Sequence, residues 1–404
     1  MISFNDASQH TQQAISPLDA QHVDLLQANG RVLADDLFAL VDSPSLDASS
    51  KDGYAVRSAD VAAATSQNPV RLRLIGALAA GESWDGQVLP ETAVRILTGA
   101  PIPSGAQAVV SDEFADDDGK TVTARKHAAP GRNVLPQGCD VALGQRLLAA
   151  GAVLRPTTLG LLAAAGHARI AVIKCPRVAI IATGDEIVAP GRPLQSGWLY
   201  ASNLVTLAAW CIHYDMDVTT CVVGDDEASL RAKLQESIAC HDAILTSGGA
   251  WKGERDLIVR LLDQLGWAKI YHRVRMGPGK AVGMGLYEGK PVFCLPGGPP
   301  SNHMAFLQLA LPGLQKLAGY GRLGLPRLVA RLAEPVRGQR DWTQFIHGRL
   351  ENPGDDVPVF YPIRIKSRLQ EMARTDAIVT IPEGVASLPR GTMTTVQVLS
   401  GMGA

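Results

Sequence analysis

The chain has 404 residues, which predicts about two to four domains at roughly 100–200 residues each. Hydrophobic residues make up 46% of the chain and charged residues 19%, so apolar side chains suffice for ordinary buried cores. Lys and Arg number 38 against 39 Asp and Glu, and no basic stripe is present, which argues against nucleic acid as the main partner. Aromatic residues reach only 5%, which argues against a surface that stacks bases or sugars.

Nothing in the chain resembles a targeting or membrane segment. The N-terminus is polar, and charged residues and a proline interrupt the longest apolar stretch, around 147–173. The six cysteines are scattered without a CxxC pair. These features predict a cytoplasmic protein with reduced thiols that does not bind a membrane.

The sequence pattern of the N-terminal half changes twice, from helical to β-like and back to helical. Residues 1–47 predict a helix capped by Asn5, then a second helix that Gly30 closes before a short strand. Residues 48–141 carry short β-like runs separated by Gly, Pro and Asp, typical of a small barrel or sandwich, with a hairpin at Asp118-Gly119. Residues 142–174 return to helix, centred on TTLGLLAAAG.

From residue 175 to 322 the pattern repeats strand, loop and helix. The predicted strands are PRVAIIATG, DVTTCVVG, DAILTSGG and KPVFCLPGG, and helical segments follow them at about 203–210, 228–239, 254–266 and 301–319. This alternation predicts an open, mostly parallel α/β sheet. Residues 323–404 again show short strands and turns, which predicts a second small β domain.

Three of these strands end in similar loops. In an open parallel sheet ligands bind beyond the carboxyl ends of the strands, and glycines let backbone N–H groups approach a phosphate. The loop residues that we expect to bind a ligand are Thr183 and Gly184, then Ser247, Gly248 and Gly249, and finally Pro296, Gly297 and Ser301.

Acidic residues also gather near these ends, at Asp185, Glu186, Asp225, Asp226 and Asp256. Two interpretations stay open. The carboxylates either cap helices, as Asp226 in GDDEASL would, or hold Mg²⁺, which prefers one or two carboxylates together with phosphate oxygens. Phosphate loops and carboxylates in one crevice favour a metal-assisted phosphate-ester site.

The ordered motifs LLQANGRVLADDL, SSKDGYAVR, RILTGAPIPSGAQAVV, TGDE, TSGG…GERD, PGK, LPGGPPS and IPEG resemble the MoeA family of molybdopterin molybdenumtransferases, which are related to the gephyrin E domain. The resemblance implies an elongated four-domain subunit of multidomain α/β plus β class. Its domains would be a discontinuous elongated domain (1–47 and 142–174), a small β domain (48–141), an α/β molybdopterin-binding domain (175–322) and a C-terminal β-barrel domain (323–404).

The resemblance also implies an activity and partners. A homodimer with a composite active site would use Mg²⁺ to convert adenylylated molybdopterin and molybdate into molybdenum cofactor and AMP. Further partners would be a MogA-like molybdopterin adenylyltransferase and apo-molybdoenzymes.

Site residues carry over where this chain matches the family's motifs. The expected catalytic residues are Asp52, Asp140, Glu186, Asp256 and Lys280. Asp52, Glu186 and Asp256 are the expected metal ligands. The expected binding residues gained from the resemblance are Thr98 and Asp226, with Ser247, Gly248 and Gly249 as the pterin-phosphate loop.

The chain departs from the family mainly in its cations. Leu135-Pro136-Gln137 stands where the family has an arginine-rich tract, and Gly277 replaces the first lysine of KPGKP, whereas Lys51 and Lys252 are new. Either the new lysines replace the lost charges, or the chain is a divergent paralogue. Such a paralogue would insert another oxyanion such as tungstate, or would deliver cofactor without turnover. A CinA-like nucleotide hydrolase is a third interpretation, but it leaves DGYA and TGAP unexplained.

Overall fold

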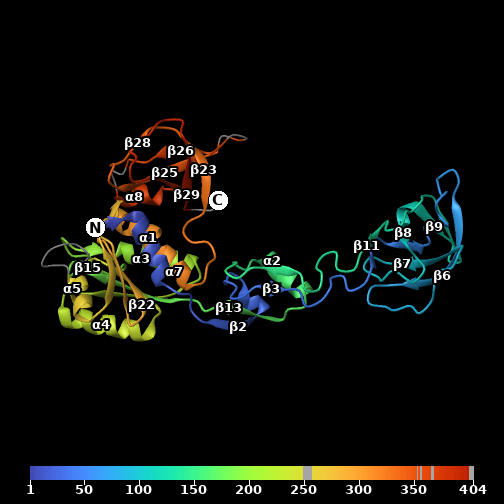
Figure 1. The fold of residues 1–404 in the computed structure, drawn as a ribbon, viewed down its shortest axis with the longest axis horizontal. Coiled ribbons are helices and arrows are strands. Elements are labelled where there is room, and N and C mark those ends of the chain that lie inside the picture. The colour runs from blue at the N-terminus through green and yellow to red at the C-terminus, as the bar shows by residue number, and fades with distance from the viewer. Residues whose placement is uncertain (249–256, 353, 355–356, 365–367, 400–404) are drawn as a thin grey trace.

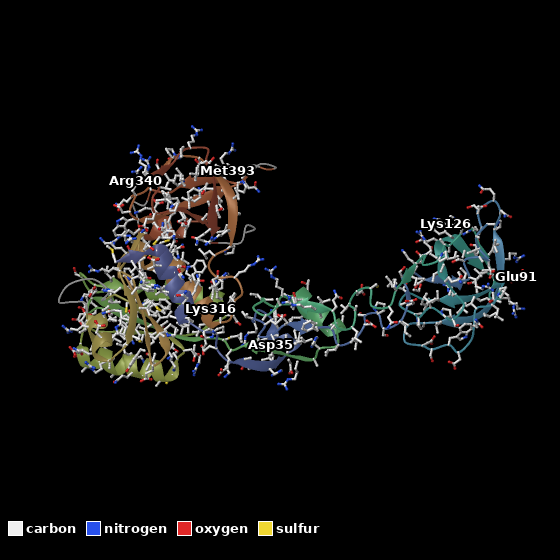
Figure 2. The ribbon with its side chains drawn as sticks, in the orientation of Figure 1. Asp35, Glu91, Lys126, Lys316, Arg340 and Met393 are labelled. Carbon is white, nitrogen blue, oxygen red and sulfur yellow. The ribbon has the colours of Figure 1, made fainter. Side chains whose placement is uncertain are left out.

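The computed structural model describes residues 1–248, 257–352, 354, 357–364 and 368–399. The subunit is elongated (Figure 1). An α/β domain and a β domain form one end, a slender domain follows, and a second β domain forms the opposite end. Figure 2 shows Asp35 on the slender middle domain, with Glu91 and Lys126 on the distant β domain. No helix in the described part of the chain is long and apolar enough to cross a membrane.

The α/β domain is built on a six-stranded sheet of order β17-β14-β18-β22-β21-β19. The first four strands are parallel, β21 runs antiparallel to β22, and β19 pairs antiparallel with β21 at the edge of the sheet. The strands are β14 (Arg177–Thr183), β17 (Asp217–Val223), β18 (Ala243–Ser247), β19 (Ala268–His272), β21 (Gly283–Tyr287) and β22 (Lys290–Leu295). The predicted parallel sheet is therefore confirmed.

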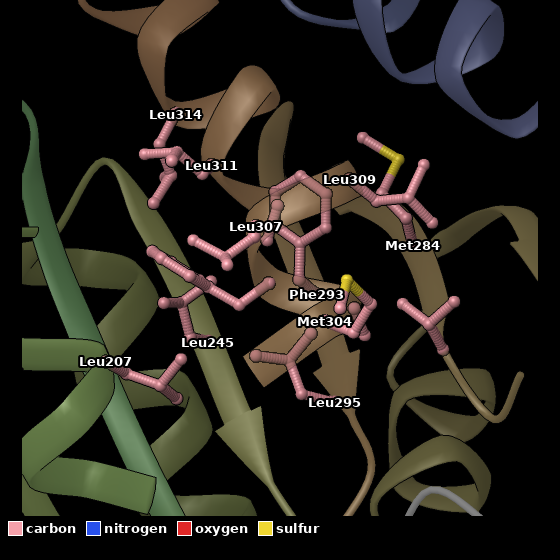
Figure 3. Close-up of a cluster of buried hydrophobic side chains, with 14 of the residues drawn as sticks. Leu207, Leu245, Met284, Phe293, Leu295, Met304, Leu307, Leu309, Leu311 and Leu314 are labelled. Atoms are coloured by element: carbon pink, nitrogen blue, oxygen red, sulfur yellow. The ribbon is translucent and has the colours of Figure 1, made fainter. Parts of the chain in front are cut away.

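Helices cover both faces of this sheet, because its strands are apolar on both sides. Ile180 packs into the core under α3 (Ser202–His213), α6 (Pro299–Ala305) and α7 (Leu311–Leu317), whereas its neighbour Ile181 packs under α4 (Glu227–Cys240) and α5 (Leu257–Gln264). The π-helix η3 (Phe306–Ala310) joins α6 to α7. Figure 3 shows the first of these cores, with Phe293 of β22 among leucines of η3 and α7. The domain also contains the short strands β15 (Ile187–Val188), β16 (Leu199–Tyr200) and β20 (Val274–Gly277).

The N-terminal segment packs on the α/β domain, although it lies within the 1–47 segment expected in the elongated domain. Strand β1 (Ile2–Ser3) pairs with β20, and helix α1 (Phe4–Ala14) buries Ala7 in the α/β core. Ser3 caps this helix by accepting from the Asp6 N–H at 3.1 Å, so Asn5 is not the cap.

The slender middle domain contains more strand than the sequence predicts. It comprises β2 (Ala20–Asp24), the 3₁₀ helix η1 (Leu25–Ala28), β3 (Leu37–Phe38), β12 (Arg146–Leu148), α2 (Pro156–Ala164) and β13 (Arg169–Ile173). The predicted helix before Gly30 is only a 3₁₀ turn, and Gly30 ends it with φ 80°. The helix at TTLGLLAAAG is confirmed as α2, but β12 and β13 flank it because both pair with N-terminal strands.

The distant β domain is a six-stranded sheet of order β8-β5-β7-β6-β10-β9, with two cores on its two faces. The six strands are β5 (Gly53–Val56), β6 (Val70–Leu78), β7 (Thr92–Ile96), β8 (Ala108–Ser111), β9 (Ala115–Asp117) and β10 (Thr121–Ala124), with the 3₁₀ helix η2 (Asp112–Phe114) after β8. A separate two-stranded sheet pairs β4 (Ala48–Ser49) with β11 (Val134–Leu135). The hairpin at Asp118-Gly119 is confirmed, since β9 and β10 pair across it and Gly119 has φ 83°.

The C-terminal domain is a closed β-barrel. Strands pair in the ring β25-β26-β23-β29-β27, and β27 returns to β25. Its elements are β23 (Arg327–Leu332), β24 (Val336–Arg337), β25 (Thr343–Glu351), β26 (Val359–Pro362), α8 (Arg368–Ala373), β27 (Ala377–Ile381), β28 (Ser387–Leu388) and β29 (Met393–Val398). Strand β20 of the α/β domain pairs with β25, so β20 and its partner β1 extend the sheet of the barrel and connect the two domains.

Candidate active site

The three predicted strand ends lie side by side at one edge of the α/β sheet. Gly248 follows β18 with φ 105°, and a Cβ there would lie 2.8 Å from the Thr183 carbonyl oxygen and 2.9 Å from its Oγ1. A Cβ on Gly297 would lie 3.7 Å from the Gly248 Cα. Only glycine allows this close approach, because any side chain at Gly248 would collide with β14. The structure thus brings together the loops that hold Thr183, Ser247 and Gly297.

Two asparagines that the sequence does not single out tie these loops together. The Asn203 amide nitrogen donates to Ser247 Oγ at 3.1 Å and to the Gly297 carbonyl at 2.8 Å. The Asn302 amide nitrogen donates to Ser247 Oγ at 3.1 Å and to the Pro296 carbonyl at 2.8 Å. Each asparagine lies at the start of a helix, where an amide ordinarily indicates a local cap. No local signal in the sequence therefore indicates a bond to a serine 44 or 55 residues away.

The third loop offers few backbone donors. Helix α6 begins with Pro299 and Pro300, and proline has no N–H. The Asn302 N–H already bonds the Gly298 carbonyl at 2.8 Å. The first turn of α6 therefore offers an anion fewer backbone N–H donors than an ordinary helix N-terminus, and the Ser301 hydroxyl is a side-chain donor in the same turn.

The acidic residues of this edge divide by role. Asp226 caps α4 by accepting from the Ser229 N–H at 2.7 Å, and hydrogen bonds from the Ser229 hydroxyl and N–H lower the pKa of the Asp226 carboxyl. Asp185 Oδ1 accepts from the Asp225 N–H at 2.9 Å, which joins the loops after β14 and β17. Glu186 is exposed, and its Oε2 lies 2.8 Å from where a Cβ on Gly184 would be. The capping interpretation therefore applies to Asp226, while Glu186 lies exposed at the loop.

The loop that carries Lys280 packs against helix α6. A Cβ on Gly279, which has φ 110°, would lie 3.2 Å from the Ser301 carbonyl oxygen and 3.2 Å from the Ala305 nitrogen. Lys280 itself is exposed. The backbone that carries its ammonium group is thus fixed beside the third strand-end loop.

Asp52 and Thr98 form a second, separate cluster in the distant β domain. Asp52 Oδ1 accepts from the Thr98 N–H at 2.6 Å and from the Thr98 hydroxyl at 2.8 Å. These two bonds lower the pKa of the Asp52 carboxyl, so it is ionised at neutral pH. Lys51 is exposed in the same turn, whose backbone Ser49 Oγ supports. These two hydrogen bonds join the TGAP and DGYA motifs.

Asp140 lies between the slender domain and the distant β domain. It is exposed, and its N–H donates to the Ser43 carbonyl at 3.0 Å. Gln137, which stands in the family's arginine tract, donates its amide to Asp42 Oδ2 at 2.8 Å. The Gln137 side chain is therefore engaged with Asp42, where the slender domain meets the distant β domain.

Within one chain the expected site residues fall into distant groups. One group lies at the α/β sheet edge and consists of Thr183, Gly184, Glu186, Ser247, Gly248, Pro296, Gly297 and Ser301. The other group lies toward the opposite end of the molecule and consists of Asp52, Thr98 and Asp140 (Figure 1). Gly249, Lys252 and Asp256 lie outside the described residues. Among the residues that are described, no three His, Cys, Asp or Glu side chains gather closely enough to hold a metal ion.

The fold and this edge define a class: an elongated multidomain protein whose parallel α/β domain carries glycine loops at the carboxyl ends of its strands. Comparison with known proteins narrows that class. Three family models match the chain in order: the MoeA N-terminal region (domain I and II) over residues 2–166, a probable molybdopterin binding domain over 179–316, and the MoeA C-terminal region (domain IV) over 329–399.

Named relatives and solved structures agree over most of the chain. Molybdopterin molybdenumtransferase 2 of Mycobacterium tuberculosis is 35% identical over 92% of this chain and 93% of its own. The Haemophilus influenzae molybdopterin molybdenumtransferase is 33% identical over 79% of this chain and 78% of its own. The crystal structure of a molybdopterin biosynthesis MoeA protein from Pyrococcus horikoshii superimposes with a TM-score of 0.82 at 32% identity, covering 99% of this chain and 100% of that one. The chain belongs to the MoeA family.

Proposed function

We propose that this chain is a molybdopterin molybdenumtransferase, which inserts molybdate into adenylylated molybdopterin and releases AMP. Support comes from relatives of that name that match nearly the whole chain. The observation that carries the proposal is the convergence of three glycine-containing strand ends around the buried Ser247 hydroxyl. A CinA-like hydrolase accounts only for the middle domain, whereas family models also match residues 2–166 and 329–399.

The residues of the sheet edge suit an anionic, phosphate-bearing substrate. Gly248 and Gly297 leave room for a phosphate to approach the backbone. Ser247 and Ser301 supply hydroxyl donors, and Lys280 supplies a cation on a fixed loop. Fixed donors and a cation in a crevice stabilise charge that develops on an oxygen during phosphate-ester cleavage.

Mg²⁺ fits the donor chemistry of the expected ligands. Asp52 is ionised and uses only Oδ1 toward Thr98, and Glu186 is an exposed carboxylate at a strand end. Carboxylates of this kind, together with phosphate oxygens, are the ligands that Mg²⁺ prefers. The ion would supply neutralisation of phosphate charge. Asp52, Glu186 and Asp256 would hold it.

We propose that Asp52 and Glu186 meet only in a homodimer. They lie in domains at opposite ends of one subunit, so a second copy must bring one of them to the other (Figure 1). The slender domain carries exposed apolar side chains, with Leu40 56%, Leu46 59% and Leu143 64% exposed. Contact with a second copy along this domain would bury them. A two-fold dimer would create two identical composite sites.

In that dimer Lys51 would accompany Asp52 to the site. This supports the proposal that Lys51 replaces part of the positive charge lost at Gln137 and Gly277. Lys252, the other candidate, lies outside the described residues. A MogA-like adenylyltransferase as supplier and apo-molybdoenzymes as recipients stay proposals that follow from the reaction.

One assay separates the proposed enzyme from its alternatives. Purified protein is incubated with adenylylated molybdopterin, Mg²⁺ and either molybdate or tungstate, and AMP release is followed. Release with molybdate supports the proposal, and a marked preference for tungstate identifies the divergent insertase. Tight pterin binding without AMP release identifies a delivery scaffold.

A further inference from the structure

The Ser247 hydroxyl has an unusual hydrogen-bond environment. It lies at the end of β18 with only 5% of the residue exposed. Two amide nitrogens, from Asn203 and Asn302, each donate to its oxygen at 3.1 Å. Both donors come from helices that begin at the same sheet edge, α3 and α6.

The orientation of both amides is determined by their second partners. Each amide nitrogen also lies 2.8 Å from a backbone carbonyl, Gly297 for Asn203 and Pro296 for Asn302. A carbonyl oxygen can only accept, so each NH₂ group must face its carbonyl. Each amide therefore uses one hydrogen on the carbonyl and the other on Ser247. Turning either amide around would place two oxygens against each other.

This arrangement determines what the serine can do. A hydroxyl oxygen has two lone pairs and one hydrogen. Asn203 and Asn302 occupy both lone pairs, so Ser247 can only donate its remaining hydrogen. None of the described residues accepts a hydrogen bond from it.

We propose that Asn203 and Asn302 are positioning residues that make Ser247 an obligate hydrogen-bond donor to an oxyanion oxygen of the substrate. The identity of that oxyanion rests on the proposed function. Two sources share this chemistry: incoming molybdate and the phosphate of adenylylated molybdopterin. A ligand group that offers only a hydrogen at this point would face another hydrogen and be rejected.

A part-buried hydrogen bond between the two helices supports the pair. The Trp210 indole N–H of α3 donates to His303 Nε2 of α6 at 2.9 Å. Indole can only donate, so His303 must present an unprotonated nitrogen there. Burial lowers the pKa of His303 to about 4, which keeps the ring neutral at physiological pH. This hydrogen bond therefore helps to fix the spacing of α3 and α6, and with it the spacing of the two amides.

The test is a double-mutant cycle on binding. Dissociation constants for molybdate and for adenylylated molybdopterin are measured by calorimetry for wild type, Ser247→Ala, Asn203→Ala and the double variant, and melting temperatures are recorded. Ser247→Ala removes one hydrogen bond to a charged oxygen and should weaken binding about tenfold or more. Asn203→Ala keeps the hydroxyl but no longer holds it as a donor, so it should weaken binding by a smaller factor. Because Asn203 acts through Ser247, adding Asn203→Ala to Ser247→Ala should weaken binding little further.

Controls separate positioning from folding. Thr206→Val changes α3 one turn beyond Asn203 and removes only a bond to the Ser202 carbonyl, so it should leave both affinities unchanged. Ser247→Thr keeps the hydroxyl and should restore binding. Should Asn203→Ala fail to fold, Ser247→Ala and Ser247→Thr still compare the presence and absence of the donor.

Each outcome decides the inference. Weakening for molybdate alone, or for adenylylated molybdopterin alone, supports it and identifies the oxyanion. If wild type binds and Ser247→Ala binds equally well, the inference is overturned while the proposed function stands. Fully additive losses of affinity in the double variant overturn it in the same way. Failure of wild type to bind either ligand overturns the proposed function together with the inference.

Discussion

The hydrogen bonds to the Asp52 carboxylate favour its charged form. Thr98 donates two hydrogen bonds to one oxygen, which lowers the pKa of Asp52 and leaves Oδ2 outside that pair of bonds. A charge at an exposed turn contributes little to folding. At the scale of the residue, we therefore expect the charge itself to act in binding or chemistry, while the bonds to Thr98 hold the carboxylate in place.

Asp52→Asn separates these roles. Asparagine keeps an oxygen acceptor for Thr98 but removes the negative charge, so the turn should persist. We expect a melting temperature within a few degrees of wild type and a loss of AMP release of about a hundredfold or more. Thermal unfolding and AMP release are the two measurements. Near-normal turnover would contradict the role, and so would unfolding that accounts for the loss.

At the scale of the element, the sheet edge depends on close backbone approach. Gly248 lies against Thr183 of the neighbouring strand in a conformation that side chains rarely adopt. The loop after β22, in contrast, has space around Gly298, whose backbone is extended (φ −71°, ψ 125°) and which has no atom within 4 Å of a built Cβ. The two glycines therefore differ in what a methyl group would cost.

Gly248→Ala and Gly298→Ala form a matched pair. The first adds a methyl 2.8 Å from the Thr183 carbonyl oxygen at φ 105°, so it should strain the loop by about 1–3 kcal/mol and weaken ligand binding. The second should leave the free energy of unfolding nearly unchanged. Chemical denaturation of both variants measures the difference. Equal stabilities would show that the loop relaxes around a side chain.

Elements with strong local signals could be predicted, and elements decided by distant partners could not. The apolar run PRVAIIATG indicates a strand buried on both faces, and β14 is one. Helix α1 has a local cap at Ser3, but its docking on the α/β core depends on residues far along the chain. The glycine loops are visible as motifs. The two asparagines that orient Ser247 are not, because their bonds span 44 and 55 residues.

At the scale of the whole molecule, the α/β domain and the C-terminal barrel meet through a buried histidine pair. His303 of α6 and His347 of β25 stack with ring centroids 6.4 Å apart. Burial lowers the pKa of each ring to about 4. Gln308 and Gln397 bond each other across the same interface at 2.7 Å. This contact ties the barrel to the helix that carries the third strand-end loop.

The histidine pair predicts a loss of stability in acid. Both folded pKa values lie below the unfolded value of about 6.5, so the unfolded chain binds more protons between pH 6.5 and pH 4. The free energy of unfolding should therefore fall as the pH drops through this range, by about 2 kcal/mol per histidine at pH 5. Denaturation at pH 7 and pH 5 measures the fall. His347→Gln should make the fall smaller, and an unchanged fall would show that other groups cause it.

Subunit mixing tests the composite site most directly. Asp52→Asn and Glu186→Gln should each be inactive as homodimers, because both sites lose one partner. In a mixed dimer one site carries both substitutions and the other carries neither. An equal mixture after dissociation and reassociation should therefore regain about a quarter of the wild-type AMP release, since half of the dimers are mixed and each has one intact site. A mixture that exchanges subunits and stays as inactive as its parents would contradict a site shared between two chains.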